Sequence, residues 1–276
     1  MSTATRKIVR GPIALAIIVV LVLQLLPFYV TLTTSLKPKT DLSSRLALPF
    51  SGLYWKNFTV AVESGNIVRA VINSTIITGA STVLVCLLGA LAAYPLARRA
   101  TRFNKAITLG VVGMIMVPPL SILVPLYSLL NRLGGINTYW GIILVLVNMQ
   151  LPLSIFLYAS FIRGLPVSLE EAAKMDGANL LQVLFRIVFP MLKPVTATVV
   201  ILTGVATWNE YALSVYLLTR PDMKTIAPAV SSFFSVQSSN LGAASAASLI
   251  AVAPILVLYL FLQKYFIKGM IAGAEK

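Results

Sequence analysis

Long apolar stretches alternate with short charged segments along the whole chain. Five stretches hold no charged residue and a sixth holds only Glu210, and each is longer than the ~20 residues that a helix needs to cross a bilayer. Backbone groups in lipid must be paired within the segment, and these stretches are too long for barrel strands. The pattern therefore predicts an all-α integral membrane protein with six transmembrane helices, at about residues 12–35, 70–96, 106–130, 138–162, 195–218 and 243–263.

Composition and charge placement support this prediction. The chain is 58% hydrophobic and only 11% charged, against roughly 25% charged residues in soluble domains. Its net charge of +14 comes from bases in loops and tails, most densely in "ARRATRFNK". Because cytoplasmic loops are enriched in Lys and Arg, we expect both termini on the cytoplasmic side of the membrane. Membrane lipid is then the expected contact, and nucleic acid is not.

The residues for common catalytic and metal chemistry are scarce. The chain has no histidine and a single cysteine, Cys86, within an apolar stretch. It contains no G-x4-G-K-[ST] sequence, so it lacks the loop that cradles nucleotide phosphates. No pair of carboxylates lies within a predicted span. We therefore expect neither an enzyme nor a metal or cofactor site in this chain.

Proline and polar side chains interrupt several apolar stretches. "MVPPLSILVPLY" in the third span predicts irregular backbone, which could line a pathway or be a packing kink. Trp208, Asn209 and Glu210 fall inside the fifth predicted span, where an acid is costly. Trp208 and Asn209 could contact a solute, whereas Glu210 could pair structurally with a partner or carry a proton. Asn148 and Gln150 in the fourth span could serve a cavity or a helix contact.

Two shorter polar segments stand between spans. "WKNFTVAVESGN" predicts a short surface helix after the first span. "SLEEAAKMDGANLLQVLFRIVFPMLKP", after the fourth, predicts a helix, a turn and a second helix. Ser168 and Glu171 fit a capping box, Asp176-Gly177 fits a helix stop, and Asn179 with Gln182 fits a second start. On these signals alone the segment could be an interfacial amphipathic connector.

The spacing within this loop resembles that of a known family. From Glu171 the chain reads E-A-A, three residues, Gly177, nine residues, Ile187, one residue, Phe189 and Pro190. This resembles the EAA loop of ATP-binding-cassette (ABC) importer permeases, with Phe189 in place of leucine. In that family the loop is a coupling helix that docks on a separate ATPase. The resemblance assigns this role to Glu170, Glu171, Ala172, Ala173, Asp176, Gly177, Ile187 and Pro190.

The resemblance extends to one branch of these permeases. "LEEAAKMDGA", "TWNEYALSVYLL" and the tail "KGMIAGAEK" are similar to carbohydrate importers of the maltose-permease G-subunit kind. It implies one permease domain over 1–276 with a core at 70–266, working by alternating access. It also implies a second permease subunit, two ATPase subunits that bind ATP and Mg, and an extracytoplasmic solute-binding protein. A proton-coupled carrier using Glu210, and a permease for a non-sugar solute such as glycerol phosphate, are the alternatives.

Overall fold

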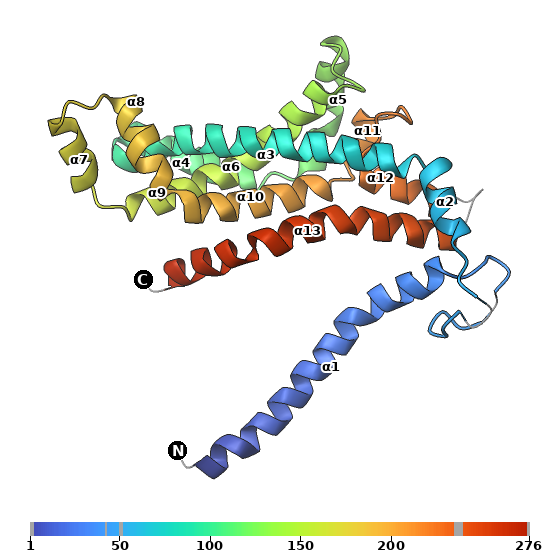
Figure 1. The fold of residues 1–276 in the computed structure, drawn as a ribbon. Helices are drawn as coiled ribbons and strands as arrows, with labels where there is room; N and C mark the ends of the chain where they lie inside the picture. The colour runs from blue at the N-terminus through green and yellow to red at the C-terminus, as the bar shows by residue number, and fades with distance from the viewer. Residues whose placement is uncertain (1–2, 42, 50–51, 235–239, 275–276) are drawn as a thin grey trace. The chain divides into compact units, whose positions relative to one another are not determined.

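The computed structural model describes residues 3–41, 43–49, 52–234 and 240–274, and the regular structure in these ranges is helical. Figure 1 shows four long helices: α1 (Thr3–Ser35), α3 (Ile67–Arg98), α6 (Tyr139–Arg163) and α13 (Leu241–Ala274). Each contains a segment long and apolar enough to cross a membrane, and two bent helix pairs raise the number of candidate spans to at most six. The prediction of an all-helical chain with several membrane spans is confirmed at this level.

The third predicted span, 106–130, is not one straight helix. α4 (Arg102–Ile115) ends before Pro118, and a 3₁₀ turn η1 (Pro119–Ile122) leads into α5 (Leu123–Arg132), with a bend of 96° across the pair. Pro118 takes an extended backbone conformation, as expected for a residue that precedes another proline. The irregular backbone predicted at "MVPPLSILVPLY" is confirmed, and the continuous helix is corrected.

The fifth predicted span, 195–218, ends early as a helix. α10 (Lys193–Trp208) stops at Trp208, and regular helix resumes only in the single turn α11 (Ser214–Leu217). Before α10 come α8 (Leu180–Gln182), a π-helical segment η2 (Val183–Val188) and α9 (Phe189–Met191), bent by 74° against α10. Glu210 therefore lies in a loop beyond the helix, not inside a continuous span.

The contacts divide the chain into two compact units. One comprises the residues up to Ile67 together with Ala229–Val252. Within it, the predicted surface helix is confirmed as α2 (Lys56–Glu63), where the buried Asn57 side-chain amide donates to the carbonyls of Ser35 and Lys37. The remaining short elements are α12 (Ile226–Ser231) and η3 (Ser232–Phe234). Asn57 thus holds the end of α1 against the start of α2.

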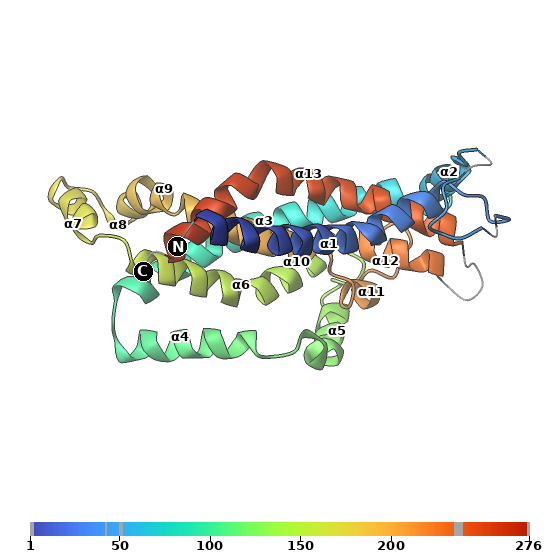
Figure 2. The same cartoon turned by 90° about the horizontal axis from the view of Figure 1, so that it is seen from below.

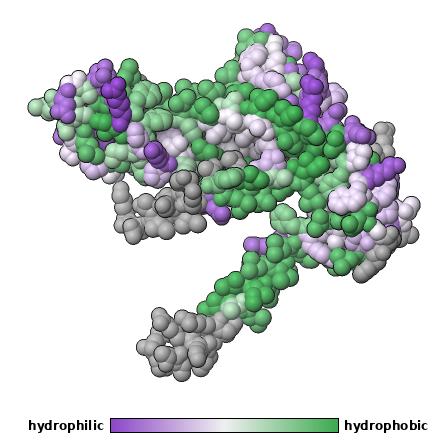
Figure 3. Space-filling model, viewed as in Figure 1, coloured by the Kyte–Doolittle hydropathy of each residue, from purple (hydrophilic) through white to green (hydrophobic). Residues whose placement is uncertain are grey.

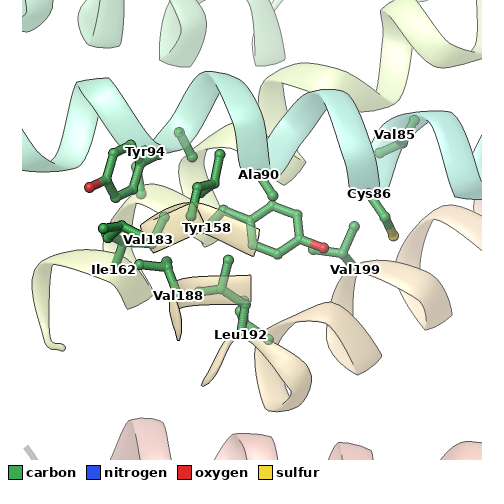
Figure 4. Packing of buried hydrophobic residues seen from close by; sticks show 14 of the residues in the cluster. Val85, Cys86, Ala90, Tyr94, Tyr158, Ile162, Val183, Val188, Leu192 and Val199 are labelled. Carbon is green, nitrogen blue, oxygen red and sulfur yellow. The ribbon is translucent and has the colours of Figure 1, made fainter. Parts of the chain in front are cut away.

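The other unit, Val68–Pro228 with Ala253–Lys276, has a core built around Tyr158 of α6. Figure 4 shows its ring enclosed by α3 residues such as Ala90 and by Val188 and Leu192 from the segment before α10. Its hydroxyl donates to Thr196 Oγ1 at 3.1 Å. α4 packs along α6, as Figure 2 shows. This packing holds α6 and α10, which the polar loop connects.

Outward-facing apolar side chains cover much of the helical surface. On the face drawn in Figure 3, hydrophobic residues cover much of the coloured helical surface, and hydrophilic residues gather around α7 (Ser168–Met175) and α5. In α4 no described side chain is buried, although its sequence is largely apolar. In water such exposure would favour aggregation, whereas lipid tails solvate it without cost.

Candidate functional site: the helix–turn–helix between α6 and α10

α7 begins at Ser168, immediately after Pro166 and Val167. The amides of Glu170 and Glu171 donate to the carbonyl of Val167, which already has helical backbone angles and provides no side-chain cap. The predicted capping box between Ser168 and Glu171 is therefore wrong. Ser168 is the first helical residue and not the extended N-cap that the motif requires. The Glu171 carboxylate is consequently not engaged in a cap.

The turn after α7 confirms the prediction from Asp176-Gly177. Gly177 has φ +84°, a conformation that other L residues rarely adopt. The amides of Gly177 and Ala178 donate to the carbonyls of Lys174 and Ala173, at 3.1 and 2.9 Å. This pair of bonds is a Schellman motif, which satisfies the carbonyls at the helix end. Gly177 therefore sets the direction in which the chain leaves α7.

A second helix starts at the predicted place. The Asn179 side chain accepts from the Gln182 amide at 2.9 Å, and the Gln182 side chain accepts from the Asn179 amide at 2.8 Å. This reciprocal capping box starts α8, which continues through η2 into α9. The helix, turn and helix predicted between the fourth and fifth spans are thus present.

α7 has one face turned into the chain and one turned out. Glu170 and Ala173, three residues apart, are buried, whereas Glu171, Ala172 and the turn residues Asp176 and Gly177 are exposed. Further along, Ile187 is partly buried and Pro190 is exposed. Next to the turn is a hollow of about 290 Å³ lined by Asp176, Gly177, Ala178, Gln182, Arg186 and Ile187. The outer face is free to contact another molecule.

Exposed apolar side chains adjoin this outer face, and their exposure was not predicted from the sequence. Met175 is 88% exposed, and Leu169, Leu180 and Leu181 are also exposed. Apolar residues in a solvated connecting loop would be expected to point inward. Their exposure indicates a contact surface beside the predicted coupling residues.

Glu170 is held by two side chains of α3. Its Oε2 accepts from the Tyr94 hydroxyl at 2.7 Å, and its Oε1 accepts from Arg98 Nε at 2.7 Å. A terminal nitrogen of Arg98 also lies 2.6 Å from Oε1, and the two side chains are only 13% and 4% exposed. Arg98 further donates to the carbonyl of Leu165 at 3.2 Å. This network ties α7 to the end of α3.

The polar residues predicted to line a pathway lie on two elements, the end of α10 and the middle of α6. Trp208 is buried at the end of α10, and the exposed Asn209 side chain donates to the carbonyl of Val205. On α6, Asn148 is exposed and Gln150 is partly buried. α6 and α10, which carry these residues or end beside them, pack against each other.

Glu210 caps the short helix that follows it. Its carboxylate accepts from the amides of Leu213 and Ser214, at 2.6 and 2.9 Å, and from the Ser214 hydroxyl. An anion at a helix start compensates the unpaired amides there. This bonding gives Glu210 a structural role within the chain, which differs from the pairing with a partner considered from the sequence.

Across the described ranges, no group of three or more His, Cys, Asp or Glu residues is placed to hold a metal ion. Another polar cluster joins the start of α3 to the segment before α12. There Asn73 donates to the carbonyls of Asp222 and Lys224 and accepts from the Tyr139 hydroxyl. Hydrogen bonding to Arg220 is the main cause that lowers the pKa of Asp222.

Comparison with known proteins gives consistent results. Residues 85–272 match the family described as "Binding-protein-dependent transport system inner membrane component". The chain is 42% identical over 277 residues to the melibiose/raffinose/stachyose import permease protein MelC of Bacillus subtilis (strain 168), covering 100% of both chains. It is 33% identical to the multiple sugar-binding transport system permease protein MsmG of Streptococcus mutans serotype c, over 92% of this chain and 93% of that one.

A solved structure shares the fold. A chain of a bacterial ABC transporter involved in the import of the acidic polysaccharide alginate superposes with a TM-score of 0.79, over 96% of this chain and 99% of that chain. Its sequence identity is 19%, so this likeness is evidence for the arrangement of helices alone.

Proposed function

The chain belongs to the family of binding-protein-dependent transport system inner membrane components, and from this premise we propose that it is the permease subunit of an ATP-driven importer for a sugar or sugar-like solute. Family members are transport subunits of the bacterial cytoplasmic membrane, which agrees with the several apolar helices. The solute class rests on relatives named for melibiose, raffinose and stachyose, for multiple sugars, and for trehalose.

The observation that carries the coupling proposal is the two-sided character of α7. Its inner face is fixed through Glu170 and Ala173, while Glu171, Ala172 and Asp176 face outward with the exposed Met175. A surface of small, acidic and apolar side chains suits a protein partner with a complementary base and an apolar hollow. That partner, in this proposal, is the cytoplasmic ATPase subunit that binds ATP and Mg.

The buried hydrogen bonds of Glu170 connect α7 mechanically to α3. When the ATPase pair closes, α7 moves with the surface on which it docks. Because Glu170 is bonded to Tyr94 and Arg98, the displacement passes to α3 rather than being lost in a flexible loop. η2 and α9 continue from the same loop into α10. One movement of the loop therefore acts on two membrane helices, as alternating access requires.

The same proposal implies a membrane topology for the chain and a set of partner subunits. A loop that docks on a cytoplasmic ATPase lies in the cytoplasm, which with six spans places both termini there as well. A second permease subunit would complete the pathway, two ATPase subunits would drive it, and an extracytoplasmic protein would deliver the solute. Trp208 and Asn209 remain the proposed solute contacts in this chain, while Glu210 orients the backbone that follows them.

Two experiments test the proposal together. First, the full chain is purified under mild detergent from cells expressing its neighbouring transport genes, and we expect a nucleotide-binding subunit to co-elute. Second, the complex is reconstituted into proteoliposomes and uptake is measured with ATP or with a proton gradient. We expect uptake of an oligosaccharide with ATP alone. Uptake driven by the proton gradient without ATP would support the secondary carrier. Uptake of glycerol phosphate but of no sugar would show that the solute is not a sugar.

A further inference from the structure

A hollow of about 510 Å³ lies where α3 ends, α4 begins and α6 ends. Its lining includes three bases, Arg99, Lys105 and Arg163, and an apolar wall that contains Leu96 and Leu109. Figure 2 shows these three helix ends gathered on one side of the unit. Arg99 and Lys105 come from the charged run "ARRATRFNK", whereas Arg163 comes from the end of α6, so the fold is what brings the third base to the hollow.

The turn between α3 and α4 holds these bases in place. The Asn104 side-chain amide donates to the carbonyls of Pro95 and Arg99, at 3.0 and 2.8 Å. The Thr101 hydroxyl accepts from the Asn104 amide at 3.1 Å and caps α4. The positions of Arg99 and Lys105 are therefore set by a bonded turn, and α4 is packed on α6, which carries Arg163 at its end.

The charge of the hollow has no counterpart within the described part of the chain. The neighbouring Arg98 has an acidic partner, Glu170, but it does not line the hollow. Arg99, Lys105 and Arg163 are exposed around the same space. Three cations around one concavity repel each other unless an anion occupies it, at a cost that low local dielectric increases.

We propose that this hollow binds one anionic phospholipid, with its phosphate among the three bases and the first part of an acyl chain along Leu96 and Leu109. The bases lie at helix ends, which is where lipid headgroups meet a spanning helix. The neighbouring side chains of α4 are apolar and exposed, including Leu109 at 73%. A soluble phosphate would use the bases but leave the apolar wall in water, so the lipid is the better match.

The proposed function places the coupling loop in the cytoplasm, so the hollow lies in the cytoplasmic leaflet, and this step rests on that proposal. Cytoplasmic leaflets carry anionic lipid, and each Lys or Arg near such a surface contributes about 1 kcal/mol. Removal of one base should then weaken binding about fivefold. This site is separate from the coupling face on α7 and does not depend on the transported solute.

The test uses native mass spectrometry on the purified full chain. Phosphatidylglycerol, phosphatidylcholine, inorganic phosphate and deacylated glycerophosphoglycerol are titrated in turn. The wild type should retain phosphatidylglycerol in preference to phosphatidylcholine, and R99Q/K105Q/R163Q should lose that preference. The matched control, K39Q/R45Q/K56Q, removes the same charge from exposed residues elsewhere and should keep it. The charge-preserving variant R99K/K105R/R163K should keep it too.

Each other outcome counts against the proposal. Equal loss of preference in K39Q/R45Q/K56Q would show that net charge, not this hollow, selects the lipid. Binding of phosphate or glycerophosphoglycerol as tight as that of the intact lipid would identify a soluble-anion site. If the triple variant does not fold, the single variants K105Q and R163Q should each weaken retention about fivefold, and unchanged retention in both would overturn the site.

Discussion

Arg98 and Glu170, 72 residues apart in sequence, form a buried ion pair at 2.6 Å between the end of α3 and α7. Tyr94 completes the pair by donating to the other carboxylate oxygen. The sequence alone offers a different explanation for each charge: the expected excess of bases in cytoplasmic loops for Arg98, and the resemblance to an EAA loop for Glu170. Their contact shows that the polar loop is bonded to a membrane helix by its charged side chains as well as by its apolar face.

Substitution of either partner of this pair should destabilise the loop. Glu170→Ala leaves Arg98 charged and nearly buried, and loss of one member of a buried pair typically costs about 3–5 kcal/mol. Glu170→Gln should be milder because it keeps an acceptor for Tyr94. Thermal unfolding of the purified protein measures both, and a double-mutant cycle with Arg98→Ala measures the coupling. Additive effects of the two substitutions would show that the pair contributes nothing.

Glu171 should behave in the opposite way. Its side chain is exposed and makes no cap, so Glu171→Gln should change the free energy of unfolding by no more than about 0.5 kcal/mol. If Glu171 pairs with a base of the ATPase, ATP-driven uptake should nonetheless fall. Comparison of unfolding temperature and uptake for Glu170→Gln and Glu171→Gln separates the inner from the outer carboxylate. Full uptake in Glu171→Gln would remove this residue from the coupling face.

Gly177 should be needed for its backbone conformation. Its φ of +84° is strained for a β-branched residue, and a Cβ there would meet nothing within 4 Å, so crowding is not the cause. Gly177→Val should therefore redirect α8 and uncouple ATP hydrolysis from uptake. Gly177→Asn, which tolerates left-handed angles better, is the matched control. The ratio of solute imported to ATP hydrolysed in proteoliposomes should fall in the first variant and stay near wild type in the second.

Glu210 should prove to be a cap and not a proton carrier. Glu210→Gln keeps an acceptor oxygen but loses the charge, so stability should decrease by about 1 kcal/mol or less. Uptake should remain dependent on ATP and insensitive to a proton ionophore in both forms. Uptake that is abolished in the variant, and collapsed by the ionophore in the wild type, would restore the carrier mechanism.

Asp222 should give a small dependence of stability on acid pH. Hydrogen bonding to Arg220 lowers its pKa in the folded chain below the usual 3.8. A lowered pKa means that the contribution is complete above the unfolded value and is lost as the pH falls through the folded value. Wild type should therefore unfold at a higher temperature than Asp222→Asn near neutral pH, and the difference should shrink below about pH 4. A difference that grows in acid would have the wrong sign.

The sequence predicted the loop well because its signals are local. Gly177 after Asp176, and Asn179 three residues before Gln182, define their turns within a few residues, and both were found as predicted. The apolar stretches likewise predicted α1, α3, α6 and α13. The predicted capping box at Ser168 is wrong because the helix starts at Ser168 itself, one residue earlier than that box requires, with Val167 as the N-cap.

Relations between distant segments could not be predicted in this way. Nothing near Glu170 indicates that Tyr94 and Arg98 would reach it, because that contact depends on how α3 packs beside α6. The length of α10 was overestimated for a related reason. Apolar residues continue past Trp208, but the Glu210 carboxylate offers the backbone a cap and the chain leaves the helix there.

The most direct test of the coupling claim is a cross-linking measurement on the assembled importer. Cys86 is the only cysteine and is buried, so Cys86→Ala gives a background for Ala172→Cys on the exposed face of α7. Val124→Cys, on the exposed surface of α5, is the matched control. The account predicts that a short bifunctional thiol–amine reagent joins the ATPase subunit to the chain through position 172 and not through position 124. An intact complex with no ATPase adduct at 172, or with equal adducts at both positions, would contradict it.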